Sequence, residues 1–213
     1  MRAIWKNLLG QLVLNSGSQN LGWTKKLVAK AALVGEEMTK LSDADLAQSL
    51  RDLDPSFIDS DKQLVRFLAI VRELADRRVG LRPFDVQLRA VAAMLRGISV
   101  EMATGEGKTL VGAIVATGLV QAGRQVHVLS ANDYLAQRDA TWMGPLLTAA
   151  DFQVAWVTSL SSREDRHAAY GTDVVYVSVT EAGFDVLRDR LAYEPEAQVG
   201  IRHDAAIIDE ADA

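Results

Sequence analysis

The chain has no cysteine, and this absence excludes disulfides, zinc–thiolate sites and catalysis by a thiol. Histidine is scarce as well: three are scattered along the 213 residues, which argues against a histidine-rich metal site. Long hydrophobic runs are also missing, since the longest weakly polar stretch, Leu110–Val120, is too short to span a bilayer. Asn7 and Gln11 interrupt the apolar stretch near the N-terminus, so no signal peptide is expected. We therefore expect the body of the protein to be cytoplasmic.

Composition and charge narrow the class of protein further. Apolar residues make up 49% of the chain and charged residues 24%, which permits a sizeable core and excludes a disordered chain. The net charge of −5 argues against a wholly basic nucleic-acid binder. Residues 1–35 hold five basic residues and no acidic one, whereas the remainder holds 18 basic and 28 acidic residues, a balance of −10. A basic head on an acidic body suggests an anionic partner for the head, such as phospholipid.

The first 80 residues carry only helical periodicity. In residues 1–14, apolar side chains recur at helical spacing and polar ones lie elsewhere, which is typical of an amphipathic helix. Ser42 followed by Asp45 resembles a capping box at the start of another helix. The sequence therefore predicts an α-helical N-terminal segment over residues 1–80. Its predicted helices are residues 1–14, Trp23–Lys40, Ser42–Leu53 and residues 64–79.

From Leu81 onward, short apolar and β-branched runs alternate with helical segments. Strands separated by helices imply βαβ units, and therefore a parallel sheet covered by helices on both faces. We expect this α/β domain to cover residues 81–213. The predicted strands are Ile98–Met102, Gln125–Ser130, Gln153–Thr158, Asp173–Val177 and Ala205–Asp209. The predicted helices follow Pro83 as far as Gly97 and cover Lys108–Ala122, Asp133–Trp142, Ser162–Tyr170 and Thr180–Leu191.

The strongest chemical signal is the segment MATGEGKT at Met102–Thr109, which follows a predicted strand and opens a predicted helix. Its glycines let backbone N–H groups turn toward phosphate oxygens, and the helix N-terminus adds partial positive charge. Lys108 places a cation at the β- and γ-phosphates, and Thr109 offers a hydroxyl to Mg²⁺. The alternative is a glycine turn that caps a helix, and Met102 stands where the strict pattern has glycine. The candidate nucleotide-binding residues of this loop are Thr104, Gly105, Glu106, Gly107, Lys108 and Thr109.

An acidic pair follows the last predicted strand. Asp209 would hold the metal, and Glu210 would orient and polarise the attacking water, so that Lys108, Asp209 and Glu210 are the candidate catalytic residues. Thr109 and Asp209 are the candidate metal ligands. Taken alone, such an acidic stretch would more often be a solvated loop. Its place behind an apolar strand, 101 residues after Lys108, favours the catalytic interpretation.

A third element, RPFDVQ at Arg82–Gln87, lies shortly before the phosphate loop. The amide of Gln87 carries a donor and an acceptor that match the exocyclic amine and N7 of adenine, and Phe84 could pack against the base. A helical glutamine on its own is usually just surface. Together the three elements imply a RecA-like ATPase core of the DExD type, with ATP or ADP and Mg²⁺ as cofactors.

Longer strings carry a resemblance to the SecA family, the ATPase motors of bacterial protein export. They are RPFDVQL at Arg82–Leu88, MATGEGKTL at Met102–Leu110, ANDYLAQRDA at Ala131–Ala140 and EAGFDVLRDR at Glu181–Arg190. The third and fourth are far more specific than a phosphate loop. The segment at 178–182 and the acidic motif DEADA depart from the family pattern. These departures indicate an accessory SecA paralogue of the actinobacterial type, of which this chain would be the N-terminal portion.

The resemblance implies an ATP-driven motor subunit that couples ATP binding and hydrolysis to the export of preproteins across the cytoplasmic membrane. It implies a SecYEG-type channel and preproteins as partners, no nucleic acid, and a protein that is cytoplasmic and peripheral on the inner face of the cell membrane. The resemblance is compatible with a homodimer but does not require one. Because the family completes its site with a second RecA-like half, residues 81–213 would be the first such domain, incomplete, with little turnover alone. The alternatives are a DExD-box RNA or DNA helicase and a nucleotide-binding fragment without turnover.

Four further residues have open interpretations. Arg138 could approach the phosphates, because the family motif around it borders the nucleotide cleft; the alternative is a surface ion pair. Trp142 and Trp156 are expected in the core, and His127 is expected to be structural. The head helix could lie on anionic phospholipid through residues 1–30, or its apolar face could pack on the protein's own body.

Overall fold

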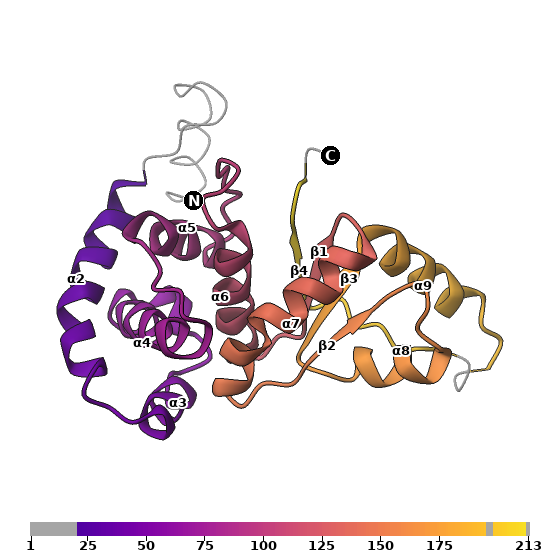
Figure 1. Cartoon of the computed structure of the whole chain (residues 1–213), viewed down its shortest axis with the longest axis horizontal. Coiled ribbons are helices and arrows are strands. Elements are labelled where there is room, and N and C mark those ends of the chain that lie inside the picture. Colours follow the sequence, from indigo (N-terminus) through magenta and orange to yellow (C-terminus); the bar gives the residue numbers. More distant parts are fainter. Residues whose placement is uncertain (1–20, 195–197, 212–213) are drawn as a thin grey trace, which may run out of the picture.

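In the computed structural model, which describes residues 21–194 and 198–211, helices gather at one side and a sheet at the other (Figure 1). The helix expected at residues 1–14 lies outside the described residues. None of the helices in the described ranges is long and apolar enough to cross a membrane.

The helical side is organised around α4, which lies against α2, α3 and η1 as well as α5 and α7. Ser42 begins α3 with the predicted capping box, and Gly80 ends α4 in the left-handed conformation. Phe57 and Phe67 pack together at this centre, with ring centroids 4.9 Å apart. The elements are α2 (Gly22–Met38), α3 (Asp43–Arg51), the short 3₁₀ helix η1 (Phe57–Asp59), α4 (Asp61–Val79) and α5 (Asp85–Leu95).

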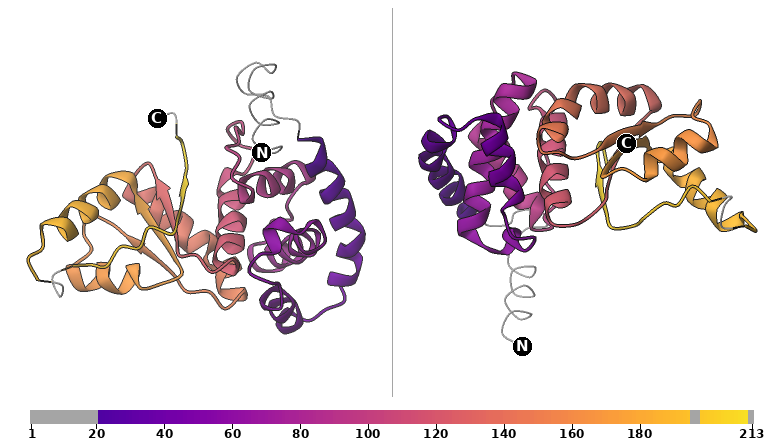
Figure 2. Two further views of the ribbon diagram at one scale, coloured as in Figure 1. Left: turned by 180° about the vertical axis from the view of Figure 1, so that it is seen from behind. Right: turned by 90° about the horizontal axis from the view of Figure 1, so that it is seen from below.

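The other side is a four-stranded, all-parallel sheet with the order β2-β3-β1-β4. In the two views of Figure 2 the helices flank this sheet on both sides, as the alternation of strands and helices predicted. The α/β fold class is therefore confirmed. Its elements are α6 (Lys108–Gln121), β1 (Val126–Ser130), α7 (Asp133–Ala149), β2 (Val154–Val157), α8 (Arg163–Tyr170), β3 (Val174–Ser178), α9 (Val179–Leu191) and β4 (Ala205–Ile208).

Alternate residues of the two central strands, β1 and β3, enter two separate cores. Val128, Tyr176 and Ile207 join the large core that also contains the buried faces of α6 and α7. Their neighbours Val175 and Val177 belong to a smaller core with residues of α8 and α9. Because successive side chains of a strand point to opposite faces, both faces of the sheet are buried under helices.

The large core does not stop at residue 80. It contains Leu27 of α2, most of the buried face of α4, and residues of β1, β3 and β4. Helix α4 also packs directly on α7. The division into a helical segment, 1–80, and an α/β domain, 81–213, stays a prediction about chain organisation.

The strand predicted at Ile98–Met102 is wrong. This segment joins no sheet in the described residues, although its burial alternates as a strand's would: positions 98, 100 and 102 are half-buried and 99 and 101 exposed. Val100 and Met102 pack on the large core through their side chains. Burial does alternate from residue to residue, but here the alternation marks an extended segment that is held by side-chain packing and not by a ladder of hydrogen bonds.

The other predicted strands are confirmed within a residue or two at each end, whereas two smaller expectations are wrong. Helix α7 continues past Trp142 to Ala149 with Pro145 inside it, and the buried Leu146 and Leu147 account for the extra turns. Trp142 and Trp156 are 48% and 43% exposed and not in the core. His127 is buried in β1 against the Tyr170 ring, as a structural histidine would be.

Helices α8 and α9 are joined by a buried ion pair. Arg166 donates from Nη1 to Asp185 Oδ2 at 2.7 Å and from Nη2 to the Thr158 carbonyl at 2.7 Å. The hydroxyl of Tyr170 donates to the same carboxylate at 2.9 Å, and Glu181 lies 2.8 Å from the guanidinium. Burial, and to a lesser extent the charge of Asp185, raise the pKa of Tyr170. The phenol therefore keeps its proton and stays a donor.

We expect Asp185→Ala to lower the free energy of unfolding by about 3–5 kcal/mol, because it removes the buried carboxylate that accepts from both Arg166 and the Tyr170 hydroxyl. Urea denaturation followed by circular dichroism measures the loss. Asp61→Ala is the matched control, since Asp61 pairs with Arg96 at the surface and is 67% exposed at its side chain. A loss for Asp185→Ala no larger than the control's would contradict a structural role for this pair.

Candidate functional site

The loop before α6 has the backbone that a phosphate cradle requires. Gly105 and Gly107 lie in the left-handed region, with φ of +86° and +80°. Residues with a Cβ rarely adopt that conformation, so the two glycines are needed for the turn. Helix α6 begins at Lys108, directly after the loop, so its first N–H groups and its dipole face the space at the loop.

Gln87 fastens this loop to the start of α5. Its Nε2 donates to the Glu106 carbonyl at 2.7 Å, and its Oε1 accepts from the Phe84 N–H at 2.8 Å. The side chain is buried, whereas Phe84 is 72% exposed. Both ends of the amide therefore hold the protein's own backbone in this arrangement. The adenine contacts of Gln87 and Phe84 stay predictions.

Lys108 and Glu210 meet at the mouth of the site. Lys108 Nζ lies 3.1 Å from Glu210 Oε1, although the two residues are 102 positions apart. Glu210 is reached through Asp209, whose N–H donates to the Leu129 carbonyl at 3.1 Å and so continues the β1–β4 pairing by one residue. Glu210 has a φ of +54°, uncommon for a residue with a side chain, and this turn directs it back toward α6.

The remaining loop residues are less engaged. The carboxylate of Glu106 accepts a hydrogen bond from the Ala103 N–H at 3.1 Å, and Thr104 is exposed. A phosphate oxygen would be a stronger acceptor for the same loop amides. The roles assigned to Thr104 and Glu106 stay predictions.

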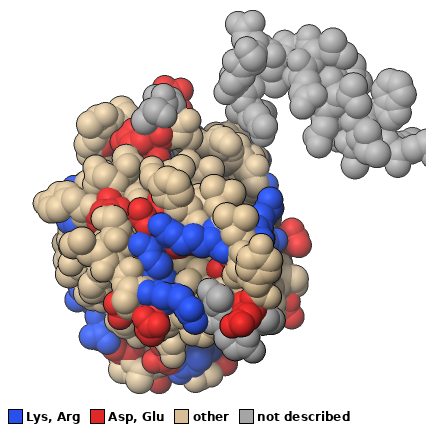
Figure 3. Space-filling model, turned by 90° about the vertical axis from the view of Figure 1, so that its right-hand side faces the viewer, with Lys and Arg blue, Asp and Glu red and all other residues tan. Residues whose placement is uncertain are grey.

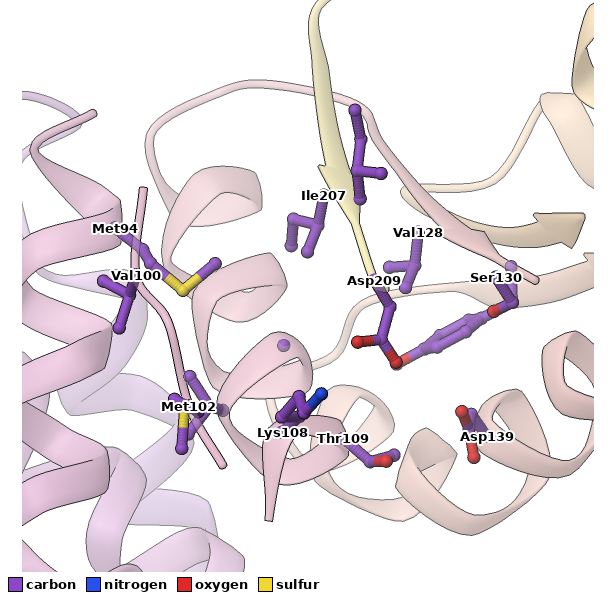
Figure 4. A pocket seen from close by; sticks show the side chains of 14 residues that line it. Met94, Val100, Met102, Lys108, Thr109, Val128, Ser130, Asp139, Ile207 and Asp209 are labelled. Carbon is purple, nitrogen blue, oxygen red and sulfur yellow. The ribbon is translucent and has the colours of Figure 1, made fainter. Parts of the chain in front are cut away.

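Lys108, Thr109 and Asp209 line one pocket beside the loop (Figure 4). The pocket's other wall is apolar, with Val100 and Met102 from the extended segment. No group of three or more histidine or acidic side chains that could hold a metal ion occurs in the ranges 21–194 and 198–211. A Mg²⁺ ion bound to a nucleotide is usually held by one or two carboxylates together with phosphate oxygens and water. The hydroxyl, the carboxylate and the lysine therefore fit a Mg²⁺–nucleotide.

Three polar residues of this pocket, Ser130, Asp139 and Tyr176, were missed by the sequence reasoning. Asp139 and Tyr176 both line it and are only 5% and 2% exposed. Burial raises the pKa of Asp139, with a smaller contribution from Asp209 and opposition from Arg138. The pKa of Tyr176 is raised by burial and then by Asp139. A tyrosine within the otherwise apolar β3 was the one signal in the sequence that could have pointed here.

Arg138 pairs with its neighbour in the chain. Its Nε lies 2.8 Å and its Nη2 2.7 Å from Asp139 Oδ1, and its side chain is 42% exposed. The ion-pair interpretation therefore describes this structure, while the phosphate role of Arg138 stays a prediction. The arginine brings positive charge to the edge of a pocket that holds two carboxylates.

Comparison with known proteins agrees with this geometry. The profile of the family described as "SecA DEAD-like domain" matches residues 9–213. The chain is 51% identical over 198 residues to the protein translocase subunit SecA 2 of Mycobacterium leprae, covering 93% of this chain and 25% of that protein. It is 48% identical over 209 residues to the protein translocase subunit SecA of Mycobacterium avium, covering 98% and 26%. The SecA 2 subunit of Mycolicibacterium smegmatis is 47% identical over 209 residues.

The chain therefore belongs to the SecA DEAD-like domain family, as its four strings predicted. It is identical to mycobacterial SecA 2 proteins at about half of the aligned positions. It spans about a quarter of the length of the curated relatives that it matches. Membership of this family implies nucleotide binding.

The contact between Gln87 and the loop leads to a test with two glycines. A Cβ at Gly107 would lie 2.3 Å from Gln87 Nε2, whereas a Cβ at Gly105 would meet nothing within 4 Å. Both glycines have similar φ, so alanine strains the backbone about equally at either. We expect Gly107→Ala to lower the free energy of unfolding by about 1–3 kcal/mol more than Gly105→Ala, through overpacking.

Urea denaturation of four variants measures that difference. Adding Gln87→Ala to each glycine variant should remove it, because the clashing amide is then gone. Equal losses for the two single glycine variants would show that Gln87 does not hold the loop.

Proposed function

We propose that this chain binds ATP and ADP together with Mg²⁺, and that it is the nucleotide-binding part of an ATP-driven preprotein translocase motor. The observation that carries the proposal is the 3.1 Å contact of Lys108 with Glu210 beside Thr109 and Asp209. It brings the phosphate-loop lysine and the acidic pair to one place. Homology to the SecA motor family supports the same activity.

Each residue has a distinct role in this proposal. The loop amides and Lys108 would hold the β- and γ-phosphates, and Thr109 and Asp209 would hold Mg²⁺, which neutralises charge on the phosphates. Glu210 would orient the attacking water and take its proton. Gln87 and Phe84 would contact the adenine, and Arg138 would approach the phosphates with the guanidinium nitrogen that does not hold Asp139.

The Lys108–Glu210 pair also sets the order of events. In the structure the lysine holds the carboxylate that the chemistry needs. When Lys108 turns to a phosphate oxygen, Glu210 is released and can act on water. Both side chains are partly exposed, so the pair is cheap to separate. Filling the phosphate site therefore favours the free base.

The wider role extends beyond these 213 residues. As an accessory SecA-type motor, the whole protein would couple ATP hydrolysis to preprotein export with a SecYEG-type channel. It would work in the cytoplasm and peripherally at the inner face of the cell membrane. It would bind no nucleic acid, and both a monomer and a homodimer are compatible with this role. The 213 residues alone should show little turnover, because the arginines of a second RecA-like half would be missing.

Calorimetric titration with ADP and Mg²⁺ tests the site. Lys108→Ala should lose most of the affinity, because a bound polyphosphate loses its cation. Glu210→Gln should bind at least as tightly as the unchanged chain, because Lys108 no longer has a charged competitor, while ATP hydrolysis by the whole protein falls about 10²-fold or more. Weaker binding by Glu210→Gln would contradict the exchange of Lys108 between carboxylate and phosphate.

Titration with other nucleotides and ATPase assays separate the competing functions. GTP binding as tightly as ATP would exclude adenine reading by Gln87. In the whole protein, ATPase activity stimulated by preproteins and acidic lipid supports a translocase, stimulation by RNA supports a helicase, and no turnover supports a regulatory nucleotide-binding module.

The basic head gives a separate prediction. Residues 1–30 combine apolar helical periodicity with five basic residues, so we propose that they bind anionic phospholipid. Liposome flotation should show binding that requires acidic lipid, falls with added salt and drops when residues 1–22 are removed. Unchanged flotation after truncation would mean that the head packs on the protein's own body.

A further inference from the structure

Asp139 is a buried carboxylate without a place in the roles given above. It projects from α7 into the same pocket as Thr109 and Asp209, and the three side chains surround one space in Figure 4. Its side chain is 7% exposed, and Arg138 contacts its Oδ1 through both Nε and Nη2. Two carboxylates at one pocket repel each other, more strongly when one of them is buried, and a cation between them would remove that cost.

Tyr176 supplies a second and independent sign of a ligand. Its hydroxyl has no hydrogen-bond partner among the residues described, although the side chain is buried and lines the pocket. Buried hydroxyls are nearly always satisfied by protein or ordered water. This hydroxyl therefore points to a water or ligand in the pocket beside Asp139.

We propose that Asp139 and Tyr176 are positioning residues for the metal side of the nucleotide site. Asp139 accepts hydrogen bonds from water on a Mg²⁺ held by Thr109 and Asp209, and the Tyr176 hydroxyl oxygen accepts from another water of the same ion. The inference rests on the proposed function, since it presumes that a Mg²⁺–nucleotide occupies this pocket. Arg138 keeps the Asp139 carboxylate in place by holding its other oxygen.

The two residues would act on metal affinity and not on the phosphates directly. Removing the charge of Asp139 weakens the hold on metal-bound water, but it also removes a negative charge near the phosphates. A purely structural role would instead weaken binding with and without metal in parallel. The sign of the effect without metal therefore separates the two explanations.

The test measures the affinity of the 213-residue chain for a fluorescent ADP analogue, in EDTA and in saturating Mg²⁺. The ratio of the two affinities is the metal increment. Asp139→Asn should reduce the increment about tenfold, as is typical when a partner of the outer metal shell is lost, and leave the affinity in EDTA unchanged or higher. Tyr176→Phe should reduce the increment about threefold, in the range expected for one neutral hydrogen bond.

Asp133→Asn is the matched control on the same helix. Asp133 accepts from the Ser159 N–H at 2.6 Å and the Ser178 hydroxyl at 2.8 Å, and it does not line the pocket. Its metal increment should equal that of the unchanged chain. Circular dichroism melting checks that each variant is folded.

An unchanged increment in Asp139→Asn, or affinities that fall together with and without metal, would overturn the inference. If Asp139→Asn does not fold, Tyr176→Phe decides, because it removes only an unpartnered hydroxyl. If the unchanged chain binds ADP without any metal increment, the proposed function fails as well. A normal increment in the unchanged chain that persists in both variants refutes this inference alone.

Discussion

The parallel pairing of β1 with β4 is the constraint on which the site depends. Leu129 of β1 lies opposite Ile208 of β4, so the two strands end together at the carboxyl edge of the sheet. The hydrogen bond from the Asp209 N–H to the Leu129 carbonyl carries this register one residue further. A slip of one residue would send Asp209 to the opposite face. Only the observed register brings both Asp209 to the pocket and Glu210 to Lys108.

Helix α6 supplies the other half of that geometry, and the whole fold holds it in place. It is apolar almost all round, as expected of a helix buried between layers. At Gly118 it approaches the helical side so closely that an added Cβ would lie 2.8 Å from Leu95 and 3.0 Å from Phe67. The position of Lys108 at the first turn of α6 is therefore fixed by packing against α4 and α5 as well as against the sheet.

Much of this was readable from the sequence, and the failures have physical causes. Periodicity found the helices and four strands because burial on one or two faces leaves its period in the residues. It failed at Ile98–Met102 because alternate burial marks any extended segment against a core, whether or not its backbone pairs. The glycine loop and the acidic pair could be picked out from the sequence because their residue types are the ones that phosphate and metal binding would need.

Side-chain partners across the fold left no comparable trace. Nothing in the sequence places Tyr176 beside Asp139, since they come from different elements and meet only through the packing of α7 on β3. The same holds for the buried pair of Arg166 with Asp185. Helix α9 also exposes Phe184 and Leu187, at 50% and 53%. This end of the molecule faces the viewer in Figure 3, where Lys and Arg side chains gather with some acidic ones beside them. The string EAGFDVLRDR, which lies in α9, therefore combines buried acidic side chains with exposed apolar ones.

The ion pairs Lys108–Glu210 and Arg138–Asp139 differ in how easily they separate, and we expect them to have different roles for this reason. Lys108 and Glu210 are 28% and 46% exposed at their side chains, so water competes for both charges and the pair contributes little. The Asp139 carboxylate is 7% exposed, so leaving it without a partner would be costly. A ligand that brings phosphate can therefore draw Lys108 away while the pair of Asp139 with Arg138 stays. The site can exchange the partner of its lysine without rearranging the side that would face the metal.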